Sequence, residues 1–362
     1  MIAAPRPVQL AIVGGGAAGM FAAAVAAEHR VSCVLIERKA RLGSKVLMTA
    51  NGRCNFTKDI SADQFIRDVG RAGAFATAAV RACPPRQIIA GFKSLGVPLR
   101  RMADGRMFPA DGKAATIVHA FGDLLRDREV PVLTNCPVKG IERSRSKVEV
   151  NSGNFVLHTR NFDLEAANVL LATGGVSYPK TGSVGDGQNF AKALGHRLVP
   201  YRPGLIGLET SDRRVTSLAG RRFEDGRVKV MDGGKTLFDY QGEVDCESFG
   251  LSGAAIYNAQ RFIEHGLKTS RAALPRAFTL EVWFGHHRLQ FGMLKPRPLK
   301  EAIVTIGGVT TDEIDARTME SKLVPHLYFA GEVMDIDGPT GGYNLTMAFA
   351  TARAAVLSIA RS

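Results

Sequence analysis

The chain has 362 residues, of which 45% are hydrophobic and 22% charged, as expected for a globular protein of about two domains. Its net charge of +13 and pI near 9.8 favour anionic partners: nucleotide cofactors, carboxylate substrates, nucleic acid or anionic lipid. The five cysteines lie far apart without a C-x-x-C pair, which argues against a disulfide framework, a zinc site or a dithiol redox centre.

The longest stretch without a polar side chain, Leu10 to Ala27, has 18 residues, against about 20 needed to span a bilayer. Four of those residues are glycines in the spacing of a nucleotide-binding turn, so we do not expect a membrane span. The N-terminus lacks the features of a signal peptide, and we therefore expect a cytoplasmic protein.

The first motif combines a strand, a glycine turn, a helix and an acid. Residues 8–13 form an apolar run that predicts a buried parallel strand. GGGAAG, residues 14–19, has G-x-G-x-x-G spacing and opens an Ala-rich helical segment. Residues 31–37 predict a second strand, which ends in Glu37, 18 positions after the third glycine.

The residue type at each position of this motif has a physical explanation. Gly14 permits the tight turn, Gly16 lets the backbone approach a pyrophosphate, and Gly19 lets helix and strand pack closely. The helix N-terminus offers N–H groups to phosphates, and Glu37 can accept hydrogen bonds from ribose hydroxyls. The motif predicts a bound dinucleotide, but alone it does not distinguish FAD from NAD.

MTANGRCNFT, residues 48–57, is a second dense loop. Arg53 could place a cation beside a phosphate or a flavin edge, and Asn55 and Thr57 add short polar groups. The alternative, which the residues alone leave open, is a turn with a solvated arginine.

The middle of the chain predicts further elements, and its character changes after Gly195. Residues 197 to about 300 hold strand-like pieces and many basic residues, which predicts an insertion. The other predicted elements, in chain order, are helices over 61–96 with breaks at Gly70 and Pro84-Pro85, a strand and helix over 104–121, a strand and antiparallel meander over 131–159, a buried strand over 168–175, and a helix from 185–187 to Leu194.

Near the C-terminus, GEVMDIDGPTGGYN, residues 331–344, has four glycines, one proline and three acids. This loop follows the apolar run 327–330 and precedes a predicted helix over 344–357. Such a composition suits neither helix nor strand and predicts a functional loop.

Together the motifs resemble a bacterial family of two-dinucleotide-binding-domain flavoproteins, described as aminoacetone-oxidase-like or bile-acid-inducible flavoproteins. The match covers about the first 195 and the last 65 residues. The matching motifs are IVGGGAAGM (12–20), NGRCNFT (51–57), GRMFP (105–109), LATGGVSYPKTGSVGDG (171–187), KEAIVTIGGV (300–309) and LYFAGEVMDIDGPTGGYN (327–344).

The resemblance implies bound FAD and an α/β fold, in which a Rossmann-like FAD-binding domain with a parallel sheet is interrupted by a β-rich insertion. We expect a discontinuous FAD-binding domain of residues 1–196 and 300–362, and an inserted, substrate-covering domain of residues 197–299. The insertion departs from the family pattern because residues 264–295 are too few for its usual helical part, although RAFTLEVWFGHHRLQFGMLK (276–295) has strand character.

The resemblance also implies positions that contact FAD. Gly14, Gly16, Gly19 and Glu37 would hold the ADP half, and Arg53 and Asn55 would lie near the flavin. Residues 172–174 would line the middle of FAD, and residues 331–344 would close over the ribityl chain and ring. The predicted set is Gly14, Gly16, Ala17, Gly19, Glu37, Arg38 and Lys45; Gly52, Arg53, Asn55, Ala172, Thr173 and Gly174; and Gly331, Glu332, Asp337, Gly338, Gly341, Gly342, Tyr343 and Asn344.

The flavin would carry the redox chemistry, and the N–H groups of residues 342–345 would face its pyrimidine edge. Arg53 and Tyr178 are the candidate catalytic residues, the first holding an anionic or carbonyl substrate and the second donating a hydrogen bond or a proton. Their alternatives are FAD binding alone and packing alone. No metal site is expected, because the histidines lack ligand spacing.

The leading hypothesis is an FAD-dependent oxidoreductase that acts on a small organic molecule. The sequence has no second G-x-G-x-x-G region, so NAD(P)H would be at most a transient donor. The alternatives are an RNA-modifying flavoprotein, which the charge keeps open although nucleic acid is the less favoured partner, and a non-catalytic flavin-binding protein with a degenerate insertion. Neither the substrate nor the oligomeric state follows from the sequence.

Overall fold

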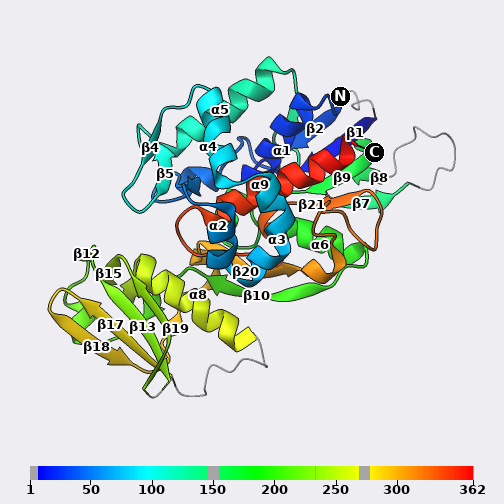
Figure 1. Cartoon of the computed structure of the whole chain (residues 1–362). Helices are drawn as coiled ribbons and strands as arrows, with labels where there is room; N and C mark the ends of the chain where they lie inside the picture. The colour runs from blue at the N-terminus through cyan, green and yellow to red at the C-terminus, as the bar shows by residue number, and fades with distance from the viewer. Residues whose placement is uncertain (1–6, 145–154, 233, 269–277, 362) are drawn as a thin grey trace. The chain divides into compact units, whose positions relative to one another are not determined.

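A computed structural model of the protein describes residues 7–144, 155–232, 234–268 and 278–361. The apolar strands predicted near both ends of the chain meet in one sheet (Figure 1). β1 (Val8–Val13) pairs in parallel with β2 (Cys33–Ile36) on one side and β9 (Asp163–Leu171) on the other. β6 (Val132–Leu133) continues the sheet beside β2, and β21 (Leu327–Phe329) pairs in parallel with β9. The centre is buried because its strands are rich in Val, Leu and Ile.

The predicted meander makes this sheet mixed instead of wholly parallel. β7 (Gly140–Arg143) and β8 (Phe155–His158) pair antiparallel, and β8 pairs antiparallel with the first half of β9. β9 is long enough to pair with both β8 and β21, since β21 pairs with its second half. Residues 145–154 of the predicted meander lie outside the described residues.

Three helices pack together: α1 (Ala17–Glu28), α5 (Ala114–Asp127) and α9 (Tyr343–Ile359). α9 and α1 lie side by side although they come from opposite ends of the chain (Figure 1). α1 has mostly alanine, and its small side chains allow close packing against β1, β2 and α9.

The region predicted to be helical over residues 61–96 forms α2 (Ala62–Val69), α3 (Arg71–Ala82) and α4 (Pro85–Ser94). Both predicted breaks are confirmed. Gly70 adopts φ +75° between α2 and α3, and Pro85 occupies the first turn of α4, where a missing N–H costs little.

Aromatic packing fixes the 48–57 loop against these helices. The ring of Phe56 lies 4.8 Å from that of Phe92, which lies 5.4 Å from Phe121. Phe349 of α9 joins the same cluster, 4.9 Å from Phe21 of α1. Such contacts add about 0.5–1.5 kcal/mol per pair beyond area burial, so the loop has a rigid base.

A small antiparallel sheet follows from this loop. β3 (Thr57–Lys58) pairs with β5 (Arg106–Pro109), which pairs with β4 (Leu99–Arg101). The helix that was predicted after β5 is α5, and the one predicted after Gly185 is α6 (Asp186–Ala193).

The chain divides into two compact units, Met1–Pro200 with Gly307–Ser362, and Tyr201–Ile306. The strands that connect them, β10 (Leu198–Gly204) and β20 (Val304–Val309), pair with each other. The predicted roles of cofactor binding for the first unit and substrate covering for the second stay predictions.

The second unit is built from two antiparallel sheets. One has the order β12-β15-β16-β11-β19 and the other β14-β13-β17-β18. Its elements are β11 (Leu208–Glu209), α7 (Arg213–Thr216), β12 (Arg222–Phe223), β13 (Arg227–Asp232), β14 (Lys235–Gln241), β15 (Val244–Glu247), β16 (Gly250–Ser252), α8 (Ala254–Lys268), β17 (Thr279–Phe284), β18 (His287–Phe291) and β19 (Lys295–Pro296).

The β-rich insertion is therefore confirmed, and it has its own core, which includes Val228, Val244 and Leu280. The strand character predicted for residues 276–295 is confirmed in β17 and β18, while 276 and 277 lie outside the described residues. α8 packs on β13 and β14.

A buried histidine lies in the first unit, away from the glycine motif. His196 Nε2 lies 2.9 Å from Ser321 Oγ, and its Nδ1 lies 3.3 Å from Glu313 Oε2. Burial lowers the pKa of the His196 imidazole, while the Glu313 carboxylate acts in the opposite direction. The imidazole is therefore neutral near pH 7.

This lowered pKa predicts lower stability in acid. Below the ordinary histidine pKa of 6.5 the unfolded chain takes up the proton first, so the free energy of unfolding falls as pH falls, by at most about 1.4 kcal/mol per unit. Urea unfolding at pH 7 and about pH 5 should show a smaller loss in His196→Gln than in the exposed control His119→Gln. Equal losses in the two variants would contradict this assignment.

Candidate cofactor and active site

The carboxyl ends of the parallel strands meet at one edge of the sheet, and the predicted cofactor residues follow them. Gly14 comes after β1, Glu37 after β2, Thr173 shortly after β9 and Gly331 shortly after β21. The chain leaves β1 toward β2 and later returns to β9 on its other side, which makes the β1–β9 gap a topological switch point. Ligands of open α/β sheets bind at this position.

The three motif glycines have different surroundings. A Cβ at Gly14 (φ +109°) would lie 2.5 Å from the Ala172 carbonyl oxygen, and one at Gly19 would lie 1.8 Å from the Gly14 carbonyl oxygen. At Gly16 a Cβ would meet no atom within 4 Å. The first two glycines are therefore required by the protein's own packing, whereas Gly16 faces open space.

This open space lies at the N-terminus of α1. Gly16 is the N-cap residue of the helix, and no side chain caps it by a hydrogen bond. The first turn also has no acidic residue, so the positive end of the helix dipole is not neutralised there. A pyrophosphate fits this arrangement of N–H groups, dipole and space.

Glu37 is held beside the same turn. Its carboxylate accepts hydrogen bonds from the backbone N–H groups of Gly15 and Lys39, each at 2.7 Å. Burial raises the pKa of the Glu37 carboxyl, while these two N–H groups and the charges of Arg38 and Lys39 act in the opposite direction. The carboxylate is thereby fixed where the motif predicts a ribose ligand.

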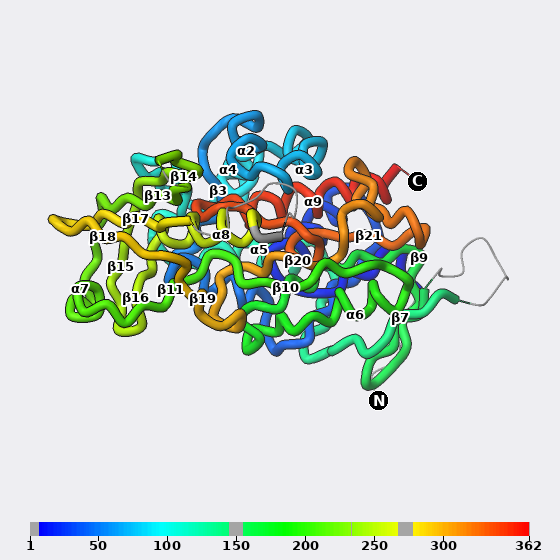
Figure 2. The backbone as a smooth tube through the Cα atoms, turned by 90° about the horizontal axis from the view of Figure 1, so that it is seen from below, coloured from blue at the N-terminus to red at the C-terminus, as the bar shows by residue number. Residues whose placement is uncertain are grey.

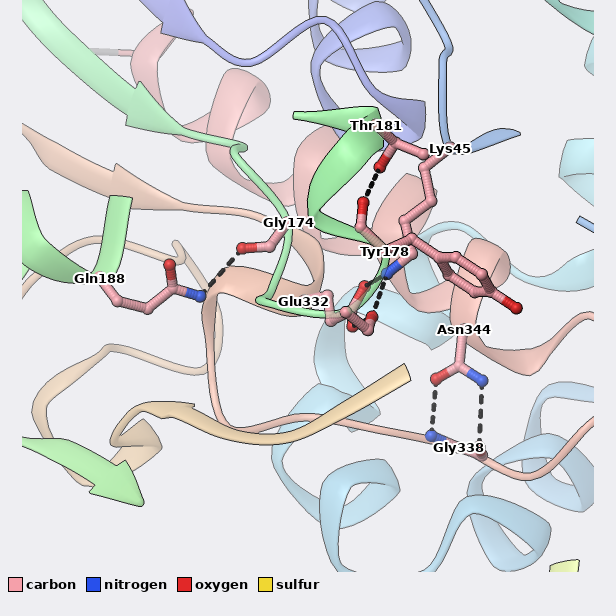
Figure 3. Close-up of polar contacts among 9 residues, drawn as sticks. Lys45, Gly174, Tyr178, Thr181, Gln188, Glu332, Gly338 and Asn344 are labelled. Atoms are coloured by element: carbon pink, nitrogen blue, oxygen red, sulfur yellow. Dashed lines mark hydrogen bonds and ion pairs between the residues drawn. The ribbon is translucent and has the colours of Figure 1, made fainter. Parts of the chain in front are cut away.

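The segment after β9 packs against α6. Gln188, which is fully buried, donates from Nε2 to the Gly174 carbonyl at 2.9 Å (Figure 3). Two buried polar atoms here, Thr173 Oγ1 and Gln188 Oε1, have no hydrogen-bond partner among the described residues. Buried polar atoms are normally paired, so these two atoms fit a polar ligand beside the predicted Thr173-Gly174 segment.

Gln188 was not part of the predicted set. Its only sequence signal is its place in the first turn of the helix that opens at Gly185-Asp186-Gly187. A Cβ at Gly187 would lie 2.1 Å from Thr173 Oγ1, so this glycine allows α6 to approach the strand end.

Two predicted cofactor residues from distant parts of the sequence form an ion pair. Lys45 Nζ lies 2.8 Å from Glu332 Oε2 and also donates to Ser177 Oγ at 2.7 Å (Figure 3). Their side chains are about one-fifth exposed, with values of 21% and 20%. The pair holds the Gly331–Val333 turn against the loop after β9. In the same region Arg38 pairs with Asp186 at 2.6 Å.

Replacing Lys45 with methionine should therefore destabilise the protein, because it leaves the partly buried Glu332 carboxylate without its cation. The expected loss is about 1.5–3 kcal/mol in the free energy of unfolding. Arg81→Met, which breaks an exposed ion pair with Asp63, is the matched control and should cost less than about 1 kcal/mol. Equal losses of unfolding free energy in the two variants, measured by urea unfolding, would show that the Lys45–Glu332 pair stabilises the protein no more than an exposed ion pair.

The loop of residues 331–344 is held by hydrogen bonds within the loop and by hydrogen bonds to Asp68 and Thr351. Asn344 Oδ1 accepts from the Gly338 N–H at 2.8 Å, and its Nδ2 donates to the Gly338 carbonyl at 3.0 Å (Figure 3). Tyr343 is buried and donates to Asp68 at 2.5 Å. The Gly331 N–H donates to Thr351 Oγ1 at 3.0 Å, and Asp337 is almost fully buried.

Gly342 joins this loop to the 48–57 loop. With the Asn55 amide assigned so that its nitrogen faces the carbonyls of Thr57 and Met107, its oxygen accepts from the Gly342 N–H at 3.2 Å. A Cβ at Gly342 (φ +92°) would lie 2.6 Å from the Thr57 carbonyl carbon. The structure thus brings together Asn55 and Gly342, two predicted residues nearly 290 positions apart.

The predicted catalytic residues lie in two different loops. Arg53 is exposed, donates from Nε to the Ala50 carbonyl at 3.0 Å, and places its guanidinium 5.5 Å from the centre of the Phe108 ring. Tyr178 has φ +50° and is partly buried, and its carbonyl accepts from Thr181 Oγ1 at 2.8 Å (Figure 3). The Arg53 side chain and the Tyr178 backbone are therefore held in place, while the roles of the two side chains stay predictions.

The described residues of the chain contain no group of three or more His, Cys, Asp or Glu placed to hold a metal ion. No helix among them combines the length and apolar character needed to cross a membrane.

Comparison with known proteins agrees with this geometry. The chain is 28% identical to the 3-dehydro-bile acid delta(4,6)-reductase of Clostridium scindens, over 95% of this chain and 97% of that protein. It is 25% identical to the ribosomal RNA dihydrouridine synthase of Haemophilus influenzae, over 97% and 98% of the two chains.

Among solved structures, the 3-ketosteroid delta1-dehydrogenase of Sterolibacterium denitrificans shares the fold, with a TM-score of 0.60 and 12% identity over 99% of this chain and 100% of that one. The sequence pattern of the HI0933-like protein Rossmann domain matches residues 8–358, nearly the whole chain. The protein therefore belongs to the HI0933-like family of FAD-dependent Rossmann flavoproteins.

Proposed function

We propose that the protein is an FAD-dependent reductase that saturates a carbon–carbon double bond conjugated to a carbonyl group. The observation that carries FAD binding is the open, uncapped helix N-terminus at Gly16, set at the switch point of the sheet. Support for the reaction class comes from the two curated relatives, whose names describe reduction of a 3-oxo bile acid and formation of dihydrouridine.

Different residues would hold different parts of FAD. Gly14, Gly16 and the N–H groups of Ala17 and its neighbours would hold the pyrophosphate, and Glu37 the ribose. Thr173, Gln188 and Gly174 would line the middle of the cofactor, and residues 331–344 with Gly52 and Asn55 would lie near the flavin. When bound, FAD supplies the hydride, and NAD(P)H is the proposed transient donor that reloads it.

Saturation of the double bond adds a hydride to one carbon and a proton to the other, and the chain must supply the proton. We assign this proton to the Tyr178 hydroxyl, which lies in the loop after β9. Arg53, fixed by Phe108 and the Ala50 carbonyl, would bind the carbonyl oxygen or an anionic group of the substrate. A cation at the carbonyl oxygen stabilises the enolate charge that develops as hydride arrives.

Removal of the proton donor tests this assignment. Tyr178→Phe should slow reoxidation of the reduced flavin by a conjugated ketone about 10²–10⁴-fold, because the general acid is lost. Reoxidation by ferricyanide, which takes only electrons, should be unchanged. Anaerobic stopped-flow spectroscopy measures both rates, and equal slowing with both acceptors would show a structural role for Tyr178.

A second candidate function is reduction of uridine in RNA, whose base is itself a conjugated carbonyl system. Two observations favour it: the net charge of +13 and the similarity to ribosomal RNA dihydrouridine synthases of two bacteria. Binding to RNA should then weaken steeply with salt, since phosphate contacts release counterions. Salt-insensitive or absent binding in a filter assay would reject this function.

A further inference from the structure

One face of the small β3–β5–β4 sheet gathers cations. Lys58 is opposite Arg106 and Arg100 is opposite Phe108 in the antiparallel registers. Directly opposite residues share a face, and so do residues two apart along a strand, so these four side chains project from the same face. Arg53 adds its guanidinium over the Phe108 ring, 5.5 Å from the centre.

Three of these cations have no carboxylate partner among the described residues: Arg53, Lys58 and Arg100. We call them the cationic face. Arg106 is different, because its Nε lies 2.6 Å from Asp104. Asp59 pairs with Arg101 at 2.8 Å, and Asp68, which accepts from the Tyr343 hydroxyl, forms no ion pair with Lys58. The cationic face therefore carries uncompensated charge.

The chain around this face adds to the same charge. Residues 69–103 contain six Lys or Arg and no Asp or Glu, and three of the six, Arg71, Arg81 and Arg101, pair with carboxylates outside this stretch. α4, which lies in this stretch and contacts β3 (Figure 2), exposes Arg86 and Lys93 without an ion pair among the described residues. Together with the cationic face, these two unpaired cations raise the local concentration of polyanions.

The cationic face also adjoins the loop predicted to close over the flavin. The ammonium of Lys58 lies 5.7 Å from the centre of the Tyr343 ring. Next to Lys58, the Thr57 backbone is in such close contact with Gly342 that only glycine fits there. A polyanion held on this face would therefore be placed beside residues 338–343.

We propose that the cationic face is the docking surface for an RNA phosphate backbone and that it brings a uridine to the flavin. This inference rests on the proposed reductase function and names its substrate class. Cations on separate strands and a loop suit a series of phosphates better than one small carboxylate. Of the exposed large apolar side chains among the described residues, none lies on β3, β4 or β5, which disfavours a membrane surface.

The test is RNA binding by a double variant with a charge-matched control. Lys58→Gln with Arg100→Gln removes two cations from the face and leaves Arg53, which is assigned to the substrate. Lys139→Gln with Lys192→Gln removes two exposed cations near β7 and on α6, at the other end of the first unit (Figure 1). The net charge is the same in both.

Fluorescence anisotropy with a uridine-containing RNA hairpin measures affinity against salt in the FAD-loaded proteins. For the face variant we expect about tenfold or greater weakening at low salt and a salt slope smaller by about two, one per lost phosphate contact. The control should bind like the original protein. Equal weakening in the two variants, or no RNA binding by the original protein, overturns the proposal.

Two further measurements separate the outcomes. Reoxidation of the reduced face variant by a small conjugated ketone should be unchanged, because the variant leaves the flavin site intact. If the original protein does not reduce the ketone, but its RNA binding still depends on the cationic face, the reductase function is rejected and the docking surface is supported. Vesicles of phosphatidylglycerol should bind the protein poorly. If the original protein binds these vesicles more tightly than RNA, and the face variant loses that binding, the cationic face would be assigned to a membrane.

Discussion

Replacing Gly16 with valine is expected to weaken FAD binding strongly while the apoprotein keeps its fold. Gly16 has an ordinary φ of −81°, and a Cβ there would meet no protein atom within 4 Å, so the fold tolerates a side chain. The valine would occupy the space where the pyrophosphate approaches the backbone of α1. We expect FAD affinity to fall at least about 100-fold, or about 2.7 kcal/mol.

The matched control is Gly91→Val. Gly91 lies in the exposed part of α4, and a Cβ there also meets no atom within 4 Å. Thermal unfolding of both apoproteins should be close to that of the original, and only the Gly16 variant should lose FAD by titration of flavin fluorescence. Full FAD occupancy in Gly16→Val would remove the observation on which the cofactor assignment depends.

The second large effect is expected at Gly342, for a different reason. Alanine at Gly342 would adopt φ +92° and place its Cβ 2.6–2.8 Å from three backbone atoms of Thr57. The backbone conformation alone costs about 1–2 kcal/mol, and the forced separation of the 48–57 and 331–344 loops adds to this. We expect a loss of about 3 kcal/mol or more in stability, together with lower FAD occupancy.

Gly112→Ala isolates the steric part of this effect. Gly112 also has a positive φ, +66°, but a Cβ there meets no atom within 4 Å. Its loss in urea unfolding should therefore be about 1–2 kcal/mol, clearly smaller than that of Gly342→Ala. If the two variants were equally stable, the contact between Gly342 and Thr57 would not determine the loop geometry.

The sequence predicted the parts of the fold that depend on local patterns. The strand–glycine–helix motif at residues 8–29 indicated β1 and α1, and Gly70 and Pro85 marked helix ends because their backbone preferences act locally. The antiparallel addition of β8 to an otherwise parallel sheet was less accessible, because the pairing partner of a strand is decided by packing with distant residues.

The same distinction applies to the candidate site. Glycine spacing indicated Gly14, Gly16 and Gly19, yet only the folded chain separates Gly16, which faces open space, from the two that pack against protein. Gln188 escaped prediction because its buried, partly unpaired amide is a property of the contact between α6 and Gly174. The pairing of Lys45 with Glu332 joins residues 287 positions apart, which no local pattern could reveal.

The cationic face shows how tertiary structure can change the weight of a sequence observation. The net charge of +13 favoured anionic partners in general. The register of β3, β5 and β4 places Lys58 and Arg100 on one face, where Arg53 lies over the Phe108 ring and Lys58 lies beside Tyr343 of the predicted flavin loop. RNA is for that reason a stronger candidate than the sequence alone suggested.

The most direct test of the reductase function is a single turnover analysed by mass. The FAD-loaded protein is reduced anaerobically, freed of excess reductant and mixed with a dienone steroid or with a uridine-containing RNA hairpin. We expect that the flavin becomes oxidised and that one of these two substrates gains two hydrogens per flavin, one at each carbon of the former double bond. Flavin that stays reduced with both substrates, or that becomes oxidised while both masses stay unchanged, would contradict it.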